Sequence, residues 1–282
     1  MKPKRVLLAG ATGYLGRYIA SLLLDNGYCG RLIVRNKQKA CFDERMFEVV
    51  EAEITKSQTL ASICNSVDIV ISTVGITRQK DGLTYMDVDY QANVNLLEEA
   101  KRNGVKKFIY VSVFNGEKLR NLKICEAKEK FTDCLKVSDL DYCIIRPNGF
   151  FSDMGDFLKM AEKGTIYLFG DGTLKLNPIH GEDLARVCLD AIESTQKEIN
   201  VGGPDLFSHK EIAELAFNAL NKKGKISHLP DWIRRFVISF LRVFTSSKTY
   251  GPFEFFLTTM GIQMSAPKYG RRHLKDFFNK SC

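Results

Sequence analysis

The sequence is poor in the residues that build metal centres and disulfide frameworks. It contains only four histidines and eight cysteines among 282 residues, and the cysteines form no C-x-x-C pair. No cysteine–histidine cluster has the spacing of a zinc site, so we predict no bound metal. Unpaired cysteines in a chain of this size favour free thiols in a reducing compartment, and we therefore expect a cytoplasmic protein.

Long apolar runs are missing as well. No stretch of about 18 uninterrupted apolar residues occurs, so no membrane-spanning helix is expected. The opening stretch MKPKRVLLAGATGYLGR contains an apolar run that is too short for a signal peptide. The net charge of +8 indicates a lysine-rich surface. Without zinc-finger spacing or a basic stretch interleaved with aromatic residues, we expect no binding of nucleic acid.

The first half of the sequence alternates short apolar runs with amphipathic segments. Helical spacing of apolar residues predicts one helix after residue 13 and others near 57–65, over 84–103 and over 121–137. Nearly continuous apolar strands between amphipathic helices indicate a parallel sheet that is covered on both faces. We therefore predict a doubly wound α/β fold of the Rossmann type. The runs that predict its strands are 4–9, 31–35, 47–54, 68–75, 106–113 and 141–147.

The character of the sequence changes after the sixth predicted strand. Residues 151–180 mix helix, turn and strand signals, and the GDG at 170–172 predicts a hairpin turn. HGEDLARVCLDAIES then returns as a helix that we expect to pack on the sheet. We therefore assign 1–150 and 181–201 to a dinucleotide-binding domain. The remainder, 151–180 and 202–282, is predicted to form a smaller, mainly helical lobe that faces the substrate.

Three glycines in the order G-x-x-G-x-x-G separate the first strand from the first helix. One glycine permits the tight turn, another lets the backbone approach a pyrophosphate, and the third lets the helix pack against the strand. Amides at the helix N-terminus then face the phosphates. The strand–turn–helix context makes the motif specific. The loop residues predicted to contact a cofactor are Gly10, Thr12, Gly13, Tyr14, Leu15 and Gly16.

The residue that ends the second strand selects between the two nicotinamide cofactors. An acidic side chain at that place binds the adenosine ribose hydroxyls and favours NAD. The sequence instead has Arg35, followed by Asn36 and Lys37. Arginine can bind a 2′-phosphate through two hydrogen bonds, so we predict NADP(H) in preference to NAD(H). A solvated arginine at a strand end is the alternative.

Several stretches resemble the atypical short-chain dehydrogenase/reductase superfamily, over roughly the whole chain. GATGYLG, IIRP and DVDYQANVNLLEEAKRNGVKKFIYVSV carry this resemblance. RPNGFFSDM, FGDGTLKLNPIHGEDLA, INVGGP and APKYGRRHLKDFF are similar to its NmrA-like branch that contains divinyl chlorophyllide 8-vinyl reductases. The resemblance implies further cofactor contacts. They are Glu53 and Ile54 at the adenine, Thr73, Val74 and Gly75 along the pyrophosphate and ribose, and Pro147, Asn148 and Phe150 beside the nicotinamide.

The catalytic tyrosine of this superfamily is missing. Its members usually carry a tyrosine four residues before a lysine, but here Ile124 stands four residues before Lys128, and none of the ten tyrosines precedes a lysine at that spacing. Phe114 occupies the usual place of the catalytic serine. Lys128 therefore has two interpretations. As the catalytic residue, it holds the nicotinamide ribose and supplies a proton or orients a water. Otherwise it is an exposed residue of EAKEK.

Near the C-terminus, PDWIRRFVISFLRVFTSS is amphipathic and too charged to span a bilayer. Residues 230–247 are compatible with peripheral contact to a membrane interface, with a cover over a substrate pocket or a partner, or with packing in the core of the small lobe. The apolar residues here and in GPFEFFLTTMGIQM favour a large hydrophobic substrate.

Three functions remain open at this point. The first is an NADPH-dependent oxidoreductase that transfers hydride to a conjugated C=C or C=O of a large apolar small molecule. The second is a non-catalytic NADP(H)-binding redox sensor or assembly factor for a membrane complex, because the tyrosine and serine are absent. Sugar-nucleotide epimerisation is a weaker third possibility, since that chemistry normally requires the tyrosine.

Overall fold

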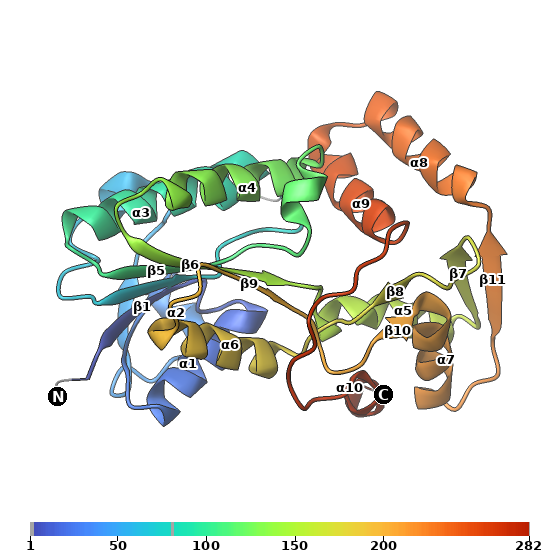
Figure 1. The fold of residues 1–282 in the computed structure, drawn as a ribbon, viewed down its shortest axis with the longest axis horizontal. Helices are drawn as coiled ribbons and strands as arrows, with labels where there is room; N and C mark the ends of the chain where they lie inside the picture. Colours follow the sequence, from blue (N-terminus) through green and yellow to red (C-terminus); the bar gives the residue numbers. More distant parts are fainter. Residues whose placement is uncertain (1–2, 80–81, 282) are drawn as a thin grey trace. The chain divides into compact units, whose positions relative to one another are not determined.

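The computed structural model describes residues 3–79 and 82–281, and the chain forms two compact units (Figure 1). Unit 1 comprises Met1–Arg146 and Leu184–Ile199, and unit 2 comprises Pro147–Asp183 and Asn200–Cys282. That unit 2 faces a substrate stays a prediction.

The centre of unit 1 is a seven-stranded sheet with the order β3-β2-β1-β4-β5-β6-β9. Its strands are β1 Arg5–Ala9, β2 Cys29–Val34, β3 Glu48–Glu51, β4 Ile69–Ser72, β5 Lys107–Val111, β6 Asp141–Pro147 and β9 Glu198–Val201. The pairings from β3 through β6 are parallel. Chain direction and strand order confirm the doubly wound α/β fold. All carboxyl ends of these strands therefore lie along one edge of the sheet, where ligands of such folds bind.

Helices cover both faces of this sheet. Figure 1 shows α3 (Ala92–Arg102) and α4 (Lys123–Lys136) over one face and α1 (Tyr14–Asp25) and α6 (Gly181–Glu193) over the other. The short helix α2 spans Lys37–Ala40. The strands are apolar on both sides because both faces are buried, and Leu7 and Leu8 of β1 are each 0% exposed.

Two predicted helices differ from the structure. Only Ser57–Leu60 of the stretch near 57–65 is helical, as a 3₁₀ turn η1, because Ala61 leaves helical geometry (ψ 127°) and Ser62 then adopts a left-handed conformation (φ 64°). The helix predicted over 84–103 begins as a π-helical segment η2 (Met86–Gln91) before α3. The Asn93 side chain donates to the Asp89 carbonyl oxygen at 2.9 Å across the junction of these segments. Such π-turns are frequent at functional sites.

Unit 2 contains two small sheets and five α-helices within the described residues. β7 (Thr165–Phe169) pairs in parallel with β11 (Lys225–Leu229), and β8 (Lys175–Leu176) pairs antiparallel with β10 (Phe207–Ser208). The predicted hairpin turn at 170–172 is therefore wrong, because the strands that flank it pair with strands from later in the chain. The helices are α5 Gly155–Glu162, α7 His209–Ala219, α8 Asp231–Phe244, α9 Ser247–Thr259 and α10 Leu274–Ser281, and two 3₁₀ turns, η3 Gly116–Leu119 in unit 1 and η4 Phe151–Met154 in unit 2, complete the set.

Within 3–79 and 82–281, no helix combines the length and the apolar character that a membrane span requires.

Candidate functional site

The glycine loop after β1 is packed so closely that side chains would not fit. Gly10 has φ +84°, and a Cβ added to it would collide with the side-chain oxygen of Thr73. A Cβ at Gly16 would collide with the carbonyl oxygen of Gly10, so α1 can approach the loop only with glycine there. The Gly13 amide donates to the Gly10 carbonyl at 3.0 Å and closes the turn. The loop therefore forms a smooth backbone surface next to the start of α1.

No acidic side chain of the first turn lies at the N-terminus of α1. In this part of the described chain, Gly13 precedes the helix without a capping side chain, and the first turn contains no acidic residue. Leu15 is 5% exposed, so only its backbone amide can reach a ligand. Thr12 is exposed, and Tyr14 packs edge-to-face against Tyr18 with ring centroids 5.5 Å apart. The positive end of the helix dipole is thus left for an external anion.

Arg35 follows β2 and its side chain is exposed. Among the described residues, its side chain takes part in no ion pair or hydrogen bond. Sequence reasoning overlooked one carboxylate nearby. Glu51 ends the neighbouring strand β3, and its Oε2 accepts a hydrogen bond from the Lys37 amide at 2.9 Å. The signal was the parallel pairing of β2 with β3, which places Glu51 opposite Val34.

Glu53 and Ile54 follow β3 on the same edge of the sheet. Oε1 of Glu53 accepts a hydrogen bond from the Thr55 hydroxyl at 3.1 Å, so this oxygen already stabilises the local turn. The carbonyl oxygen of Ile54 accepts one from the Asn95 amide at 3.0 Å, and its side chain packs against the core of unit 1. A role at an adenine stays a prediction for both residues.

Thr73 and Val74 tie the end of β4 to its neighbours. The Thr73 hydroxyl donates to the Ala9 carbonyl at 3.1 Å, which joins β4 to the glycine loop. Val74 is 6% exposed, and its carbonyl oxygen lies 3.4 Å from the amide nitrogen of Asn93. Asn93 in turn accepts a hydrogen bond from Ser72 at 2.5 Å. These contacts hold the chain after β4 in one position.

Lys128 of α4 forms an ion pair with Asp89 of η2. Its Nζ atom lies 2.8 Å from Oδ1 of Asp89, and the Lys128 side chain is 12% exposed while that of Asp89 is 0% exposed. A Cβ added to Gly75 would lie 2.6 Å from both of these atoms, so the pair lies directly against the backbone after β4. Oδ2 of Asp89 accepts a hydrogen bond from the Ile76 amide at 3.2 Å. The interpretation of Lys128 as an exposed residue is therefore wrong.

Burial and charge act in opposite directions on this pair. Burial disfavours the Lys128 ammonium, but the Asp89 carboxylate and the Tyr110 side chain outweigh it, so the pKa of Lys128 is raised. Complete burial raises the pKa of Asp89, against the lowering effect of Lys128. The ring centroid of Tyr110 lies 5.7 Å from Nζ. A lysine whose pKa is raised is a poor proton donor near neutral pH, but it keeps its charge for binding.

Asp89 and Tyr110 were missed by sequence reasoning, although each carries a signal. Asp89 stands in helical register with the buried Val88 and Ala92, where a charged side chain needs a partner. Tyr110 lies in β5, whose five residues are all buried, and it is 0% exposed. Burial raises the pKa of its hydroxyl. Tyr110 is therefore beneath Lys128, in the core, rather than at the surface where a substrate binds.

The serine near the end of β5 has a structural partner. The Ser112 hydroxyl donates to Oε1 of Glu129 at 3.1 Å. Glu129 is 0% exposed and accepts two hydrogen bonds from Arg146, at 2.5 and 2.9 Å. Arg146 also donates to Glu198 at 3.1 Å. Ser112 is thus part of a buried ion-pair cluster between α4, β5 and β6. Ile124 of α4 is also buried.

The three predicted contacts in unit 2 differ in how their side chains are used. Pro147 is buried at the end of β6. The amide nitrogen of Asn148 donates to Asn177 at 2.7 Å and to the Met264 carbonyl at 2.5 Å, so its side chain is committed within unit 2. Phe150 is half-buried and precedes η4. A cofactor contact by Asn148 stays a prediction that its side-chain hydrogen bonds do not favour.

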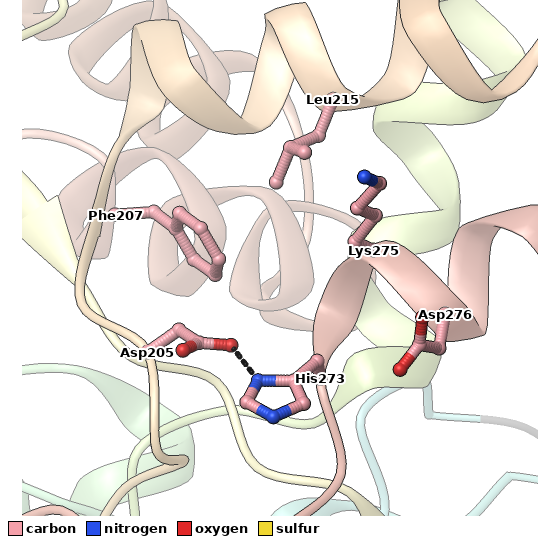
Figure 2. Close-up of a pocket in the computed structure, with 6 residues that line it drawn as sticks. All are labelled: Asp205, Phe207, Leu215, His273, Lys275 and Asp276. Carbon is pink, nitrogen blue, oxygen red and sulfur yellow. Dashed lines mark hydrogen bonds and ion pairs between the residues drawn. The ribbon is translucent and has the colours of Figure 1, made fainter.

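A shallow pocket in unit 2 is distinct from the glycine loop. Figure 2 shows that Asp205 and His273 lie at one side of it, with 2.7 Å between Oδ2 and Nδ1. The Asp205 carboxylate raises the pKa of His273. Lys275 and Asp276 of α10 lie on the same side as His273 (Figure 2). No predicted site residue is among the six described residues that line this pocket.

The geometry of unit 1 fits a dinucleotide. The closely packed glycine loop, the open N-terminus of α1 and the exposed Arg35 lie at the carboxyl edge of one sheet, and so does Gly75 with the Lys128 ammonium against it. The loop amides and α1 are suited to a pyrophosphate, and a lysine with a permanent charge is suited to a ribose hydroxyl.

Comparison with known proteins also indicates a nicotinamide dinucleotide as the ligand. Residues 10–195 match the model of a family described as NAD(P)H-binding. The photosystem II assembly factor Ycf39 of Synechocystis is 28% identical over 246 residues, which cover 85% of this chain and 75% of that protein. The chloroplastic divinyl chlorophyllide a 8-vinyl-reductase of Arabidopsis thaliana is 26% identical over 327 aligned residues, which cover 99% of this chain and 77% of that enzyme.

Solved structures share the fold. A quinone oxidoreductase of Escherichia coli in complex with NADPH superposes with a TM-score of 0.72 at 17% identity, over 98% of this chain and 99% of that one. A nucleoside-diphosphate-sugar epimerase of Staphylococcus aureus superposes with a TM-score of 0.71 at 17% identity, over 98% and 99%. At this level of identity the likeness concerns the fold alone.

Proposed function

The chain belongs to the NAD(P)H-binding family, and we propose that it is an NADPH-dependent reductase of a large apolar small molecule. The hydride for a conjugated C=C or C=O group comes from the nicotinamide when it is bound. Support for a reductase comes from the similarity to an 8-vinyl-reductase, which extends over 99% of this chain and therefore includes unit 2. The free thiols of the seven described cysteines are compatible with the cytoplasmic location that we also propose.

The single observation that carries this proposal is the position of Lys128. Its ammonium is held by Asp89 against the backbone of Gly75, which follows β4 at the ligand-binding edge of the sheet. We propose that Lys128 donates a hydrogen bond to a nicotinamide ribose hydroxyl. Because its pKa is raised, Lys128 keeps its proton, and it orients the cofactor rather than protonating the product.

The preference for NADP(H) rests on Arg35. Its exposed guanidinium follows β2, at the place where this fold distinguishes the two cofactors. Glu51 is the carboxylate near this place, but its Oε2 atom already accepts a hydrogen bond from the Lys37 amide. We propose that Arg35 binds the 2′-phosphate, that the glycine loop from Gly10 to Gly16 binds the pyrophosphate, and that Thr73 keeps the loop in place.

A non-catalytic NADP(H)-binding assembly factor is the second candidate. It is favoured by the similarity to an assembly factor over 85% of the chain. It is also favoured by the local structure around Lys128, because Ile124 is buried at the place of the tyrosine and Ser112 is bound to Glu129.

Turnover distinguishes the two candidates. We expect purified protein to oxidise NADPH when it is offered conjugated enones, quinones or divinyl tetrapyrroles, and to be slow with NADH. Lys128→Met tests the role of the lysine, and Lys130→Met is its control. Lys130 is exposed in the same helix, and its ammonium lies over the ring of Tyr90. We expect only Lys128→Met to weaken both NADPH binding and turnover. Tight NADPH binding without turnover of any of these substrates would reject the reductase and leave the assembly factor.

A further inference from the structure

An aromatic stripe runs along the exposed side of α8 in unit 2. Its aromatic members recur every four residues, which places them on one face of the helix. The ring centroids of Phe240 and Phe244 are 4.5 Å apart, and those of Phe236 and Phe240 are 6.2 Å apart. The stripe consists of Trp232, Phe236, Phe240 and Phe244, which are 65, 61, 48 and 69% exposed, and the aliphatic Val243 of the same helix is 75% exposed.

The opposite side of α8 is attached to α9. The buried Arg234 donates to the Leu257 carbonyl at 3.2 Å, and its guanidinium lies against Gly261. Further along the helix, Arg242 donates to Glu254 at 2.5 Å. These contacts determine which face of α8 is left outside. The interpretation of this segment as core of the small lobe is therefore wrong, because the large rings point away from α9.

The charges around the exposed face of α8 indicate which kind of surface it binds. Residues 230–256 contain four basic and two acidic side chains, and the whole chain carries a net charge of +8. Neither carboxylate is left unpaired at the surface. Glu254 is 2% exposed, and Asp231 forms ion pairs with Arg234 and Arg235. Of the basic groups, Arg234 is buried against α9, whereas the side chains of Arg235 and Arg242 are 76 and 48% exposed. A convex aromatic stripe bordered by exposed cations matches an anionic lipid interface, where rings enter the headgroup region and cations bind lipid phosphates.

We propose that the aromatic stripe of α8 docks unit 2 on an anionic membrane surface. A helix of 14 residues is about 21 Å long and can lie in the headgroup plane along its whole length. Phe253 and Phe256 of α9 are exposed as well. This docking does not rest on reductase activity, because the residues that carry it are in unit 2 and the glycine loop is in unit 1.

The chain contains its own reporter for this proposal, because Trp232 is its single tryptophan. We expect the full chain to co-sediment with vesicles of phosphatidylcholine and phosphatidylglycerol, and to bind phosphatidylcholine alone at least about tenfold more weakly. On binding, the emission of Trp232 shifts to the blue, and lipids brominated on the acyl chain quench it. High salt weakens the binding.

Two variants test the surface, with a matched control. Phe236→Ser combined with Phe240→Ser removes two exposed rings, and we expect it to lower vesicle affinity about tenfold or more. Tyr167→Ser removes an exposed ring of β7 in the same unit and should leave the affinity unchanged. An unchanged circular dichroism spectrum and unchanged urea unfolding verify that the double variant is folded.

Three results overturn the proposal. They are no binding to phosphatidylglycerol vesicles, equal binding by the double variant, and equal binding to both kinds of vesicle. A concentration-dependent dimer that the double variant abolishes, without vesicle binding, would assign the stripe to a second copy of the chain instead.

Discussion

The Lys128 ammonium and the Asp89 carboxylate lie 2.8 Å apart, with only 12% of the Lys128 side chain exposed. Removing one member leaves the other as an unpaired buried charge. We expect Asp89→Asn or Lys128→Met to lower the free energy of unfolding by about 3–5 kcal/mol. The combined change Asp89→Leu with Lys128→Met should cost less than the sum of the single changes, because no charge is then buried alone. Urea unfolding followed by circular dichroism measures all of these values.

A surface pair serves as the control for this experiment. Lys101 and Glu98 lie 3.4 Å apart on the exposed side of α3. We expect Lys101→Met to change the free energy of unfolding by less than about 0.5 kcal/mol. If Lys128→Met costs no more than Lys101→Met, the buried pair does not contribute to stability and our account of Lys128 fails.

Arg35 is expected to discriminate between the two nicotinamide cofactors. A guanidinium–phosphate hydrogen bond contributes about 1.5–3 kcal/mol, so we expect Arg35→Ala to raise the Kd for NADPH about 10- to 100-fold. The Kd for NADH should change little, because NADH lacks the 2′-phosphate. Arg45→Ala is the control, since Arg45 is exposed and pairs with Asp43. Titration by isothermal calorimetry gives both constants, and an equal loss for NADPH and NADH would contradict the role of Arg35.

Gly16 tests whether close packing of α1 creates the cofactor surface. A Cβ added at this position would collide with the Gly10 carbonyl oxygen. We therefore expect Gly16→Ala to lower the free energy of unfolding by about 1–3 kcal/mol and to weaken NADPH binding. Gly155 starts α5 with φ −58°, and a Cβ there meets no described atom within 4 Å. Gly155→Ala should therefore be neutral or stabilising by about 0.4–1 kcal/mol. Similar losses in both variants would argue against a special role for the loop.

His209 makes stability depend on pH. It is 2% exposed at the start of α7, and burial lowers its pKa to about 4 from a usual value near 6.5. At pH 7 the residue is neutral in both states. As the pH falls from about 6.5 to 4, the unfolded chain takes up a proton that the folded chain does not, so about 3 kcal/mol of stability is lost.

Unfolding in urea at several pH values reveals this dependence. His209→Gln should remove most of the slope between pH 6.5 and 4, whatever its cost at pH 7. His273→Gln should act in the opposite direction, because the Asp205 carboxylate raises the pKa of His273 and stabilises its charged form at low pH. A slope that His209→Gln leaves unchanged would show that His209 is accessible to protons in the folded state.

Local patterns predicted more about unit 1 than about unit 2. Strands buried on both faces are continuous apolar runs, so six strands of the parallel sheet could be predicted from the sequence. In unit 2 the strands β8 and β10 have only two residues each and pair with distant partners. The 170–172 turn therefore looked like a hairpin, because its glycines signal a turn without signalling which strands pair.

The amino-acid sequence by itself determined the alternation of strands and helices, the glycine loop, and the absence of a tyrosine four residues before Lys128. These features depend on neighbours along the chain. The tertiary structure alone decided that Asp89 holds Lys128, that Glu51 reaches the Lys37 amide, and that the rings of α8 point outward. Each of these depends on contacts between segments far apart in the sequence, where burial and the need to pair a charge select the partner.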